Sequence, residues 1–218
     1  EDVWVDDSGL HLTIRPRDGG WWCTEVVLTQ SLGYGTYIFQ TQSRIDLFDP
    51  SIVAAFFTWV SDAPSDRRRE FDIEFSRWGD SGRDKIVHYI IQPCSNCSDQ
   101  SECCVDFPLD LSEGPMGVTY RVRWEPGRLG FLSTRESSKQ NPETEEEILN
   151  KWDFAGDLVP EPGGETVRIN FWLYRGIPPA DGQPVEFLVS DFRFVSFTGV
   201  DTWMIYSTAS GFRSGRVK

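Results

Sequence analysis

The sequence predicts an all-β sandwich, and three of its features lead to that fold class. Aromatic residues make up 14% of the 218 residues, glycine (19) and proline (13) are frequent, and apolar and polar residues alternate in many short segments. Aromatic residues favour strands, glycine and proline favour turns, and alternation with a period of two is typical of a strand with one buried face. We find no long helical period, repeat or linker, so we expect one domain spanning residues 1–218.

Strands are predicted wherever such a segment is bounded by turn residues. In chain order they are Leu10–Ile14, Thr24–Gln30, Gly35–Ser43, Ile52–Val60, Arg69–Phe75, Ile86–Gln92, Thr119–Trp124, Leu129–Ser133, Val167–Tyr174 and Glu186–Phe197. One helix is predicted over Thr144–Lys151, because Thr144 can cap it and Glu147 follows three residues later. We interpret that helix as an insertion in a loop.

The charge of the chain limits its partners. The formal net charge is −13 and the pI is near 4.6. A nucleic-acid partner needs a clustered basic face, so we expect no nucleic acid and instead a neutral or cationic partner. The longest apolar run, Ile52–Val60, is far shorter than the roughly 18 residues of a membrane span, so we expect no membrane partner. We expect a monomer.

Four of the five cysteines lie close together, in a segment rich in Ser, Asn and Asp: Cys94, Cys97, Cys103 and Cys104. Both zinc sites and disulfide-stapled loops use such clusters, but adjacent cysteines give poor tetrahedral geometry, so disulfides are favoured. Cys23 stands apart and is expected to be a buried free thiol. A stapled surface loop predicts a secreted, extracellular protein.

The segment Glu70–Phe75 carries an acid at every second position. Its apolar residues must face the core, which places Glu70, Asp72 and Glu74 in one row on the opposite face. Like charges so close raise one another's pKa and weaken a fold. Glycoside hydrolysis uses such a row, because one carboxylate acts as nucleophile or base and another, kept protonated, acts as general acid.

A solvated strand face is the alternative interpretation of this row. Its acids would then pair with neighbouring arginines: Arg67, Arg68, Arg69 or Arg77. The nearly all-apolar segment Ile52–Val60 just upstream argues against it, because it indicates an interior strand, where charges usually pair or take part in chemistry.

A second segment, Val167–Tyr174, has a similarly two-faced pattern. Its apolar residues alternate toward the core and leave a set of polar and aromatic residues together on the other face: Arg168, Asn170, Trp172 and Tyr174. Aromatic rings suit the apolar face of a pyranose, so this face is predicted to bind sugar and Trp172 to be partly exposed. If Trp172 and Tyr174 were buried, a purely structural sandwich would be favoured instead.

These residues resemble a known family. The run Glu70-Phe71-Asp72-Ile73-Glu74 resembles the Glu-x-Asp-x-Glu signature of glycoside hydrolase family 16, which includes bacterial licheninases and plant xyloglucan transglycosylases. Further segments resemble the family in order and spacing: residues 32–37, 53–59, 120–127 and 170–172. The resemblance implies a concanavalin A-like β-jelly roll, a sandwich of two antiparallel sheets with a concave carbohydrate-binding cleft.

The resemblance also implies roles for individual residues. It implies Glu70 as nucleophile, Glu74 as general acid/base and Asp72 as their assistant. It implies further cleft residues: Glu25, Tyr34, Asn170 and Trp172. Licheninases have a substrate-binding Arg where this chain has Val27, so strict licheninase specificity is not expected.

Other positions keep two interpretations each. Trp78 forms a subsite wall or is a packed turn aromatic, and His88 reaches the cleft or is a hydrogen-bonded strand residue. No cofactor is expected for catalysis, but the resemblance implies a structural calcium at Gly9 and Asp191. The alternative for Asp191 is an outward surface acid, because it alternates with Phe192 and Phe194.

The sequence thus predicts an endo-acting, retaining glycoside hydrolase that cleaves a β-linked polysaccharide, with β-glucan as the first expectation. A transglycosylase with the same machinery and a non-catalytic carbohydrate-binding jelly roll are the alternatives.

Overall fold

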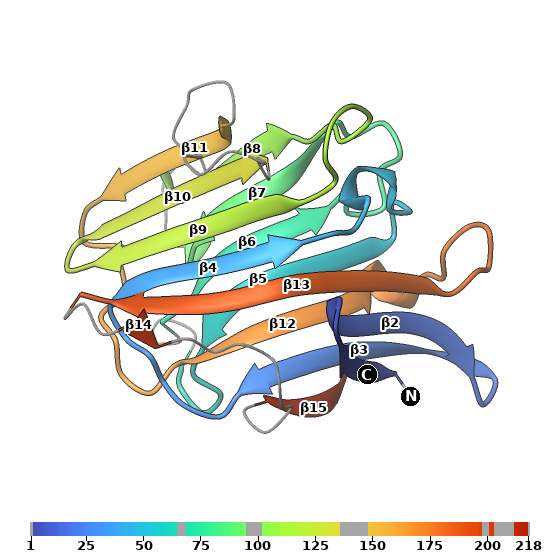
Figure 1. Cartoon of the computed structure of the whole chain (residues 1–218), viewed down its shortest axis with the longest axis horizontal. Helices are drawn as coiled ribbons and strands as arrows, with labels where there is room; N and C mark the ends of the chain where they lie inside the picture. Colours follow the sequence, from blue (N-terminus) through green and yellow to red (C-terminus); the bar gives the residue numbers. More distant parts are fainter. Residues whose placement is uncertain are drawn as a thin grey trace.

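Strands make up nearly all the regular structure in the computed structural model (Figure 1). The structure describes residues 2–64, 69–94, 102–135, 148–197, 201–202 and 212–217, the last two ranges by their backbone alone. The strands are β1 (Val3–Asp6), β2 (Gly9–Arg17), β3 (Gly20–Leu28), β4 (Gly35–Thr41), β5 (Ile52–Trp59), β6 (Phe71–Ser76), β7 (Lys85–Ile91), β8 (Cys104–Pro108), β9 (Val118–Glu125), β10 (Arg128–Arg135), β11 (Ile148–Ala155), β12 (Thr166–Leu173), β13 (Val185–Ser196), β14 (Asp201–Thr202) and β15 (Phe212–Val217). Short 3-10 turns cover Ile45–Leu47 and Tyr174–Gly176.

The strands lie in two antiparallel layers. One layer has the order β11-β10-β9-β4-β13-β2 and the other β3-β12-β5-β6-β7-β8. The layers are joined through β2 and β3, whose pairing covers Arg15–Arg17 and Gly20–Trp22. The sandwich is therefore one hydrogen-bonded path folded over on itself, with the two layers facing each other (Figure 1).

Aromatic side chains from both layers meet between them. Phe39 of β4 stacks on Phe56 of β5, with ring centroids 4.3 Å apart, and Phe187 of β13 lies 6.3 Å from Phe75 of β6. These rings are at most 2% exposed. Face-to-face packing of two antiparallel layers over such a core is the predicted β-sandwich of the jelly-roll class, so the expected fold class is confirmed.

All ten predicted strands lie on observed strands, but the predicted helix is wrong over the part that the structure describes. Residues 148–151, at its end, belong to strand β11, which pairs with β10 along the edge of its layer. Residues 144–147 lie outside the described ranges. Pairing with β10 is a long-range contact, and it outweighs the local capping signal.

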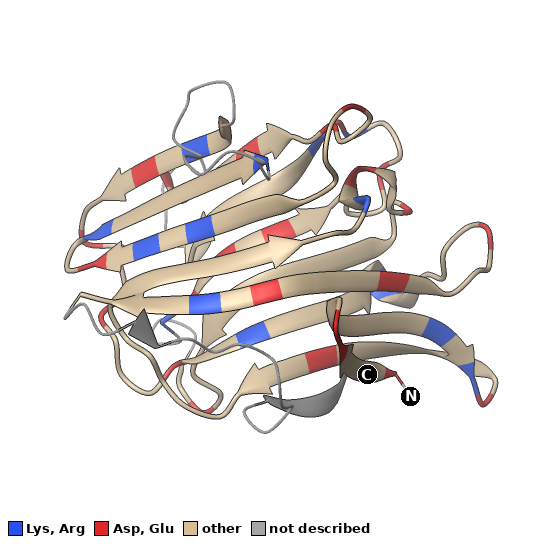
Figure 2. Ribbon diagram, in the orientation of Figure 1, with Lys and Arg blue, Asp and Glu red and all other residues tan. Residues whose placement is uncertain are grey.

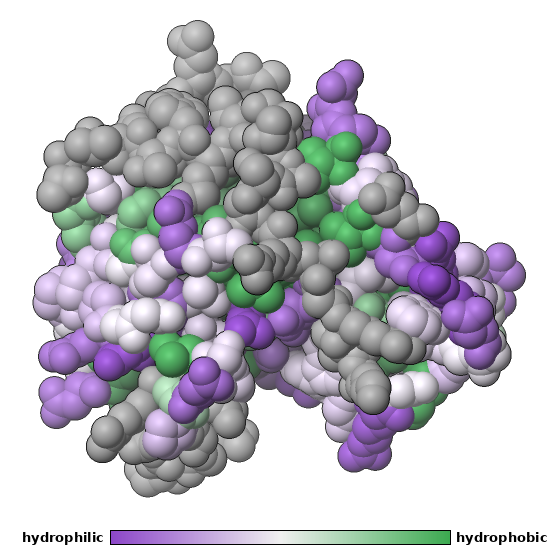
Figure 3. All heavy atoms as spheres, turned by 90° about the horizontal axis from the view of Figure 1, so that it is seen from below, coloured by the Kyte–Doolittle hydropathy of each residue, from purple (hydrophilic) through white to green (hydrophobic). Residues whose placement is uncertain are grey.

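Charges of both signs are distributed along the strands (Figure 2). In the view from below, hydrophilic residues form much of the coloured outline at the two sides, and apolar residues are visible nearer the middle (Figure 3). Among the described residues, no helix is long and apolar enough to cross a membrane.

Candidate active site

Two acids of the signature, Asp72 and Glu74, lie on the outer face of β6, and the third, Glu70, directly precedes the strand. Their neighbours Phe71, Ile73 and Phe75 are each 1% exposed and fill the core, so alternation turns the acids away from it. The pairings of β6 with β5 and β7 run without a register shift, so no bulge separates Asp72 from Glu74. Glu70, Asp72 and Glu74 line one cleft of about 320 Å³.

Strand register explains which residues join the acids in that cleft. Glu74 lies opposite Ala55 on β5, and Ala55 lies opposite Asn170 on β12. Asn170 in turn lies opposite Glu25 on β3. Glu25 and Asn170 therefore share a row across the sheet with Glu74, and both line the cleft, as does Trp172.

A second row places a cation in the cleft. Asp72 lies opposite Phe57, which lies opposite Arg168, which lies opposite Val27. Val27 is uncharged, so the positive charge in this row comes from Arg168 on the neighbouring strand β12. Its Nη1 donates to Glu25 Oε1 (2.9 Å) and its Nη2 to Ser61 Oγ (2.6 Å).

The Glu25–Arg168 pair is mostly buried, with side-chain exposures of 17% and 16%. Burial raises the pKa of Glu25, and Arg168 opposes that effect.

Two aromatic residues of the cleft were not predicted. Phe57 and Trp59 of β5 line it beside the acids. The signal was present in the sequence, because every second position of β5 shares the outer face with Ala55, which neighbours Glu74. The nearly continuous apolar run over β5 hid that alternation.

Burial and like charge control the protonation of the acids. Asp72 is 3% exposed, and burial, followed by the charges of Glu70 and Glu74, raises its pKa well above the usual value. Its side chain has hydrogen bonds with Glu70 and with Gln92 Nε2 (3.3 Å). Burial, then the charges of Glu70 and Asp106, raises the pKa of Glu74 to about 7. Glu74 can therefore hold a proton near neutral pH, as a general acid requires.

His88 lies next to Glu74 across the β6–β7 pair, but it is only 2% exposed. Its Nδ1 contacts Asp106 Oδ1 (2.7 Å) and its Nε2 contacts the carbonyl oxygen of Ser76 (2.9 Å). Both ring nitrogens are thus engaged by protein, which matches the interpretation of a hydrogen-bonded strand residue.

Asp106 also accepts a hydrogen bond from Arg83 Nη2 (2.6 Å). Burial acts against ionisation of Asp106, but the hydrogen bond and charge of His88 hold its pKa below the usual value.

Trp78 lies in an aromatic group next to Trp172, which lines the cleft, but Trp78 itself is not among the residues that line it. Its ring centroid lies 6.3 Å from that of Trp172, 5.5 Å from Tyr174 and 5.9 Å from His88. Trp172 on β12 is half-buried, as the sugar-binding interpretation of its strand face predicts. Tyr174 is also half-buried, but it lies in the 3-10 turn that follows β12 and does not line the cleft.

Tyr34 belongs to a neighbouring pocket of about 530 Å³, which Arg69, Gln92 and Glu161 also line. The buried carboxylate of Glu165 holds the adjacent loops together, accepting hydrogen bonds from residues of both: Ser31 Oγ, Gly33 N and Gly163 N. This pocket adjoins the acids, because Arg69 precedes Glu70 and Gln92 contacts Asp72.

The positions implied for calcium lie close together but offer few ligands. A Cβ added at Gly9 would lie 2.4 Å from the carbonyl oxygen of Val189, two residues before Asp191. Asp191 is ion-paired with Arg193 Nε at 2.8 Å. Among the described residues, no three acidic, histidine or cysteine side chains converge as metal ligands. The residues present thus fit calcium poorly, and the site stays a prediction.

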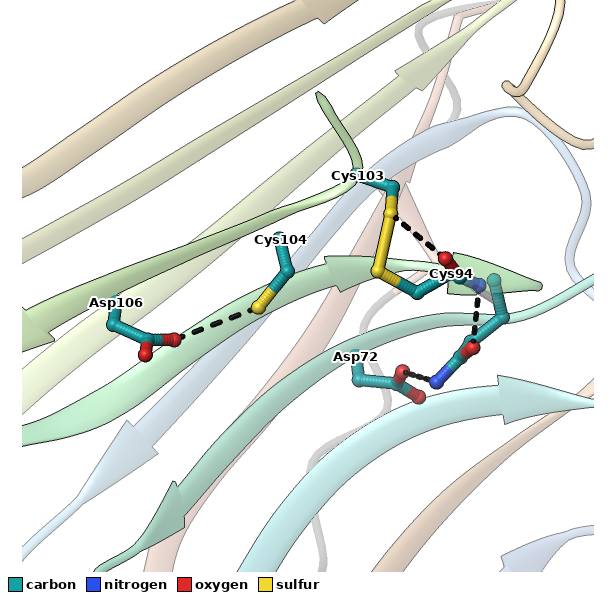
Figure 4. The surroundings of a disulfide bond; sticks show 6 residues. Asp72, Cys94, Cys103, Cys104 and Asp106 are labelled. Carbon is teal, nitrogen blue, oxygen red and sulfur yellow. Dashed lines mark hydrogen bonds between the residues drawn. A yellow bond between two sulfur atoms is a disulfide. The ribbon is translucent and has the colours of Figure 1, made fainter. Parts of the chain in front are cut away.

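One disulfide is present among the described cysteines, joining Cys94 and Cys103 (Figure 4). This confirms a disulfide in the cysteine cluster. Cys104 and Cys23 are free, and Cys23 is half-buried rather than fully buried. Burial, then the charge of Asp106, raises the pKa of Cys104 to about 12. Cys97 lies outside the described residues.

Comparison with known proteins finds similarity in structure and not in sequence. No protein-family model matches the chain, and no curated protein matches it. A β-glucanase from Bacillus licheniformis is 20% identical with a TM-score of 0.58, over 88% of this chain and 81% of the other. An immunostimulatory antigen and pseudo β-1,3-glucanase of Mycobacterium tuberculosis is 20% identical with a TM-score of 0.57, over 87% and 75%.

A third similar structure is an elongating β-1,3-glucosyltransferase of glycoside hydrolase family 16, at 15% identity and a TM-score of 0.54, over 79% of this chain and 69% of the other. These structures include a hydrolase, a transferase and a protein described as a pseudo-enzyme. They share one architecture with this chain, which therefore has the jelly-roll fold of the glycoside hydrolase family 16 β-glucanases.

Proposed function

We propose that this protein is a secreted, endo-acting glycoside hydrolase that cleaves a β-linked polysaccharide, with β-glucan as the expected substrate. The observation that carries the proposal is that Glu70, Asp72 and Glu74 line one cleft, where they lie on or directly before a strand whose other face is core. A solvated strand face would leave such acids exposed, whereas Asp72 is almost fully buried between two other carboxylates. Burying acids so close together is costly, and glycoside hydrolysis uses that arrangement.

In the proposed mechanism Glu74 is the general acid/base. Its pKa of about 7 keeps a proton available to protonate the leaving-group oxygen. After the leaving group departs, the same carboxylate removes a proton from the attacking water.

Glu70 is the proposed nucleophile. Ionised, it attacks the anomeric carbon and forms a glycosyl–enzyme intermediate, which water then hydrolyses. The hydrogen bond between Asp72 and Glu70 holds the nucleophile in place, and the raised pKa of Asp72 lets it carry the proton of that bond. No cofactor takes part in these steps.

The spacing of the two glutamates favours retention of configuration. Four residues of strand separate their Cα atoms by roughly 13 Å. Side chains leaning toward Asp72 bring the carboxyls to about 5 to 6 Å, as in retaining enzymes, whereas inverting enzymes need about 6.5 to 9.5 Å to admit a water. The hydrogen bond of Glu70 to Asp72 is consistent with such a lean.

The remaining cleft residues suit a neutral sugar chain. The faces of Phe57, Trp59 and Trp172 can stack on pyranose rings, and the polar groups of Glu25, Arg168 and Asn170 can bond to hydroxyls. Arg168 is already paired with Glu25, so the cleft does not demand an anionic substrate. The adjoining pocket at Tyr34 offers room for further sugar units, as an enzyme acting within a chain requires.

The proposal is tested by reducing-sugar release from lichenan, laminarin, xyloglucan and agarose. Wild-type protein should release oligosaccharides from at least one, while Glu70→Gln and Glu74→Gln should each lose several orders of magnitude in turnover with melting temperatures near that of wild type. Products longer than the starting oligosaccharide would indicate the transglycosylase alternative. Binding without turnover by wild-type protein would indicate the carbohydrate-binding alternative and contradict the proposal.

A further inference from the structure

Gln92 connects the catalytic row to the cysteine loop. It follows β7, and its backbone N–H donates to the carbonyl oxygen of Glu70 (3.1 Å). Its side-chain Nε2 donates to Asp72 Oδ2 (3.3 Å). One residue thus bonds to the backbone of Glu70, the proposed nucleophile, and to the carboxylate of Asp72.

The orientation of the Gln92 amide is fixed from its other end. The backbone N–H of Cys94 donates to Gln92 Oε1 at 2.9 Å (Figure 4). A backbone N–H can only donate, so the amide oxygen must face Cys94 and the NH₂ group must face Asp72. A flipped amide would set two donors against each other at Cys94 and two acceptors against each other at Asp72.

Cys94 is itself held by the disulfide to Cys103. Cys103 is fully buried, and its carbonyl oxygen accepts a hydrogen bond from the backbone N–H of Ile91 (2.8 Å). Ile91, directly before Gln92, and Cys94, two residues after it, are therefore both tied to Cys103, the first by a hydrogen bond and the second by the disulfide.

We propose that Gln92 is a positioning residue that orients Asp72 within the catalytic row, and that the Cys94–Cys103 disulfide holds Gln92 in the conformation that does so; this inference rests on the proposed function. The amide donates to one carboxylate oxygen of Asp72, and this fixes the rotation of the carboxyl group relative to Glu70. It also stabilises the ionised form of the Asp72–Glu70 pair, which shares a hydrogen bond.

The other groups described around Asp72 do not stabilise its ionised form. Asp72 lies opposite Phe57 on β5 and Ile90 on β7, and neither titrates. The charges that act on it come from Glu70 and Glu74, which oppose its ionisation. Loss of the Gln92 donor should therefore raise the pKa values of the Asp72–Glu70 pair.

The first test compares Gln92→Leu with wild type and with the matched control Gln183→Leu, at an exposed turn residue far along the chain. Gln92→Leu should lower kcat about tenfold with little change in KM, because a hydrogen bond to the ionised Asp72–Glu70 pair is lost. The acidic limb of the pH–rate profile should move to higher pH, and Gln183→Leu should match wild type. A uniform fall in activity at every pH, or no change, would overturn the inference.

The second test examines the disulfide. Reduction with a phosphine, or Cys94→Ser, should shift the acidic limb of the wild-type profile in the same direction as Gln92→Leu. It should add little to Gln92→Leu itself, because both changes remove the same donor. Additive effects of reduction and Gln92→Leu would show that the disulfide does not act through Gln92.

A third measurement separates this inference from the proposed function. The carboxyl ¹³C resonances of Asp and Glu can be titrated without substrate, in wild type and in Gln92→Leu. The resonance of Asp72 should titrate at higher pH in the variant, whether or not any glucan is cleaved. An unchanged titration refutes the role of Gln92, and a shifted titration in a protein that cleaves no β-glycan refutes only the proposed function.

Discussion

Asp106 should tune the acidity of Glu74 from two strands away. Glu74 on β6 lies opposite His88 on β7, and His88 lies opposite Asp106 on β8. Neighbouring strands are about 4.8 Å apart, so roughly 10 Å separates the two acids. At that distance, an effective dielectric constant between about 20 and 80 gives an interaction of roughly 0.4 to 1.7 kcal/mol, or about 0.3 to 1.2 pKa units.

Asp106→Asn should therefore lower the pKa of Glu74, which is about 7 in the wild-type protein. A general acid acts in its protonated form, so activity is lost as pH rises through its pKa. The alkaline limb of kcat/KM should move to lower pH by up to about one unit. Arg83, which pairs with Asp106, would lose its partner and act in the same direction.

The assay is a pH–rate profile of wild type, Asp106→Asn and the control Asp181→Asn, which changes an exposed turn acid. The control should keep the wild-type alkaline limb. Because Asp106 also holds His88 and Arg83, Asp106→Asn should melt at a lower temperature, but that effect does not move a pH limb measured on folded protein. An alkaline limb that stays in place or moves to higher pH would refute the electrostatic reasoning.

Three further predictions follow from named contacts. Trp172→Ala should weaken glucan binding at least tenfold, about 1.4 kcal/mol. Because the ring is half-buried, its removal should lower the free energy of unfolding by less than the roughly 3 to 5 kcal/mol lost with a fully buried Trp. Calorimetric binding and thermal melts measure the two effects, and the reverse balance would make Trp172 a core residue. Free-thiol titration of the unfolded, unreduced protein should find at most three of the five cysteines free, and five free thiols would contradict the Cys94–Cys103 disulfide. His11 stacks on Trp4 and contacts Asp6 and Glu186, each at 3.0 Å; burial lowers its pKa, but the two acids outweigh this and raise it. The stability from this raised pKa is present in full below the unfolded pKa of about 6.5 and is lost as pH rises through the folded pKa. His11→Gln should therefore lower the melting temperature more at pH 5.5 than at pH 8.5. An equal loss at both pH values would contradict the contact.

Local sequence pattern was enough to predict much of this structure. The alternation in Glu70–Phe75 determines which face the acids take, because a strand has only two faces and three apolar neighbours must share the core. The same reasoning placed Asn170 and Trp172 in the cleft.

The hydrogen bonds and strands that the sequence did not predict depend mainly on contacts between distant residues. Arg168 reaches Glu25 across 143 residues of sequence, and Gln92 reaches Asp72 only because of the β6–β7 register. Strand β11 was predicted in part as helix because its pairing with β10 leaves no local signal. Strand β8 was missed because it follows directly on the cysteine-rich loop and ends at Pro108.

The stereochemistry of the first product tests the central claim most directly. A ¹H NMR time course of a β-glucan oligosaccharide with wild-type protein, and with Glu70→Gln and Glu74→Gln as controls, follows the anomeric protons before they equilibrate. Retention through a Glu70 adduct predicts that the β-anomer appears first with wild type and that neither variant produces it at a comparable rate. Appearance of the α-anomer first, or undiminished turnover in either variant, would contradict the assignment of Glu70 and Glu74 as a retaining catalytic pair.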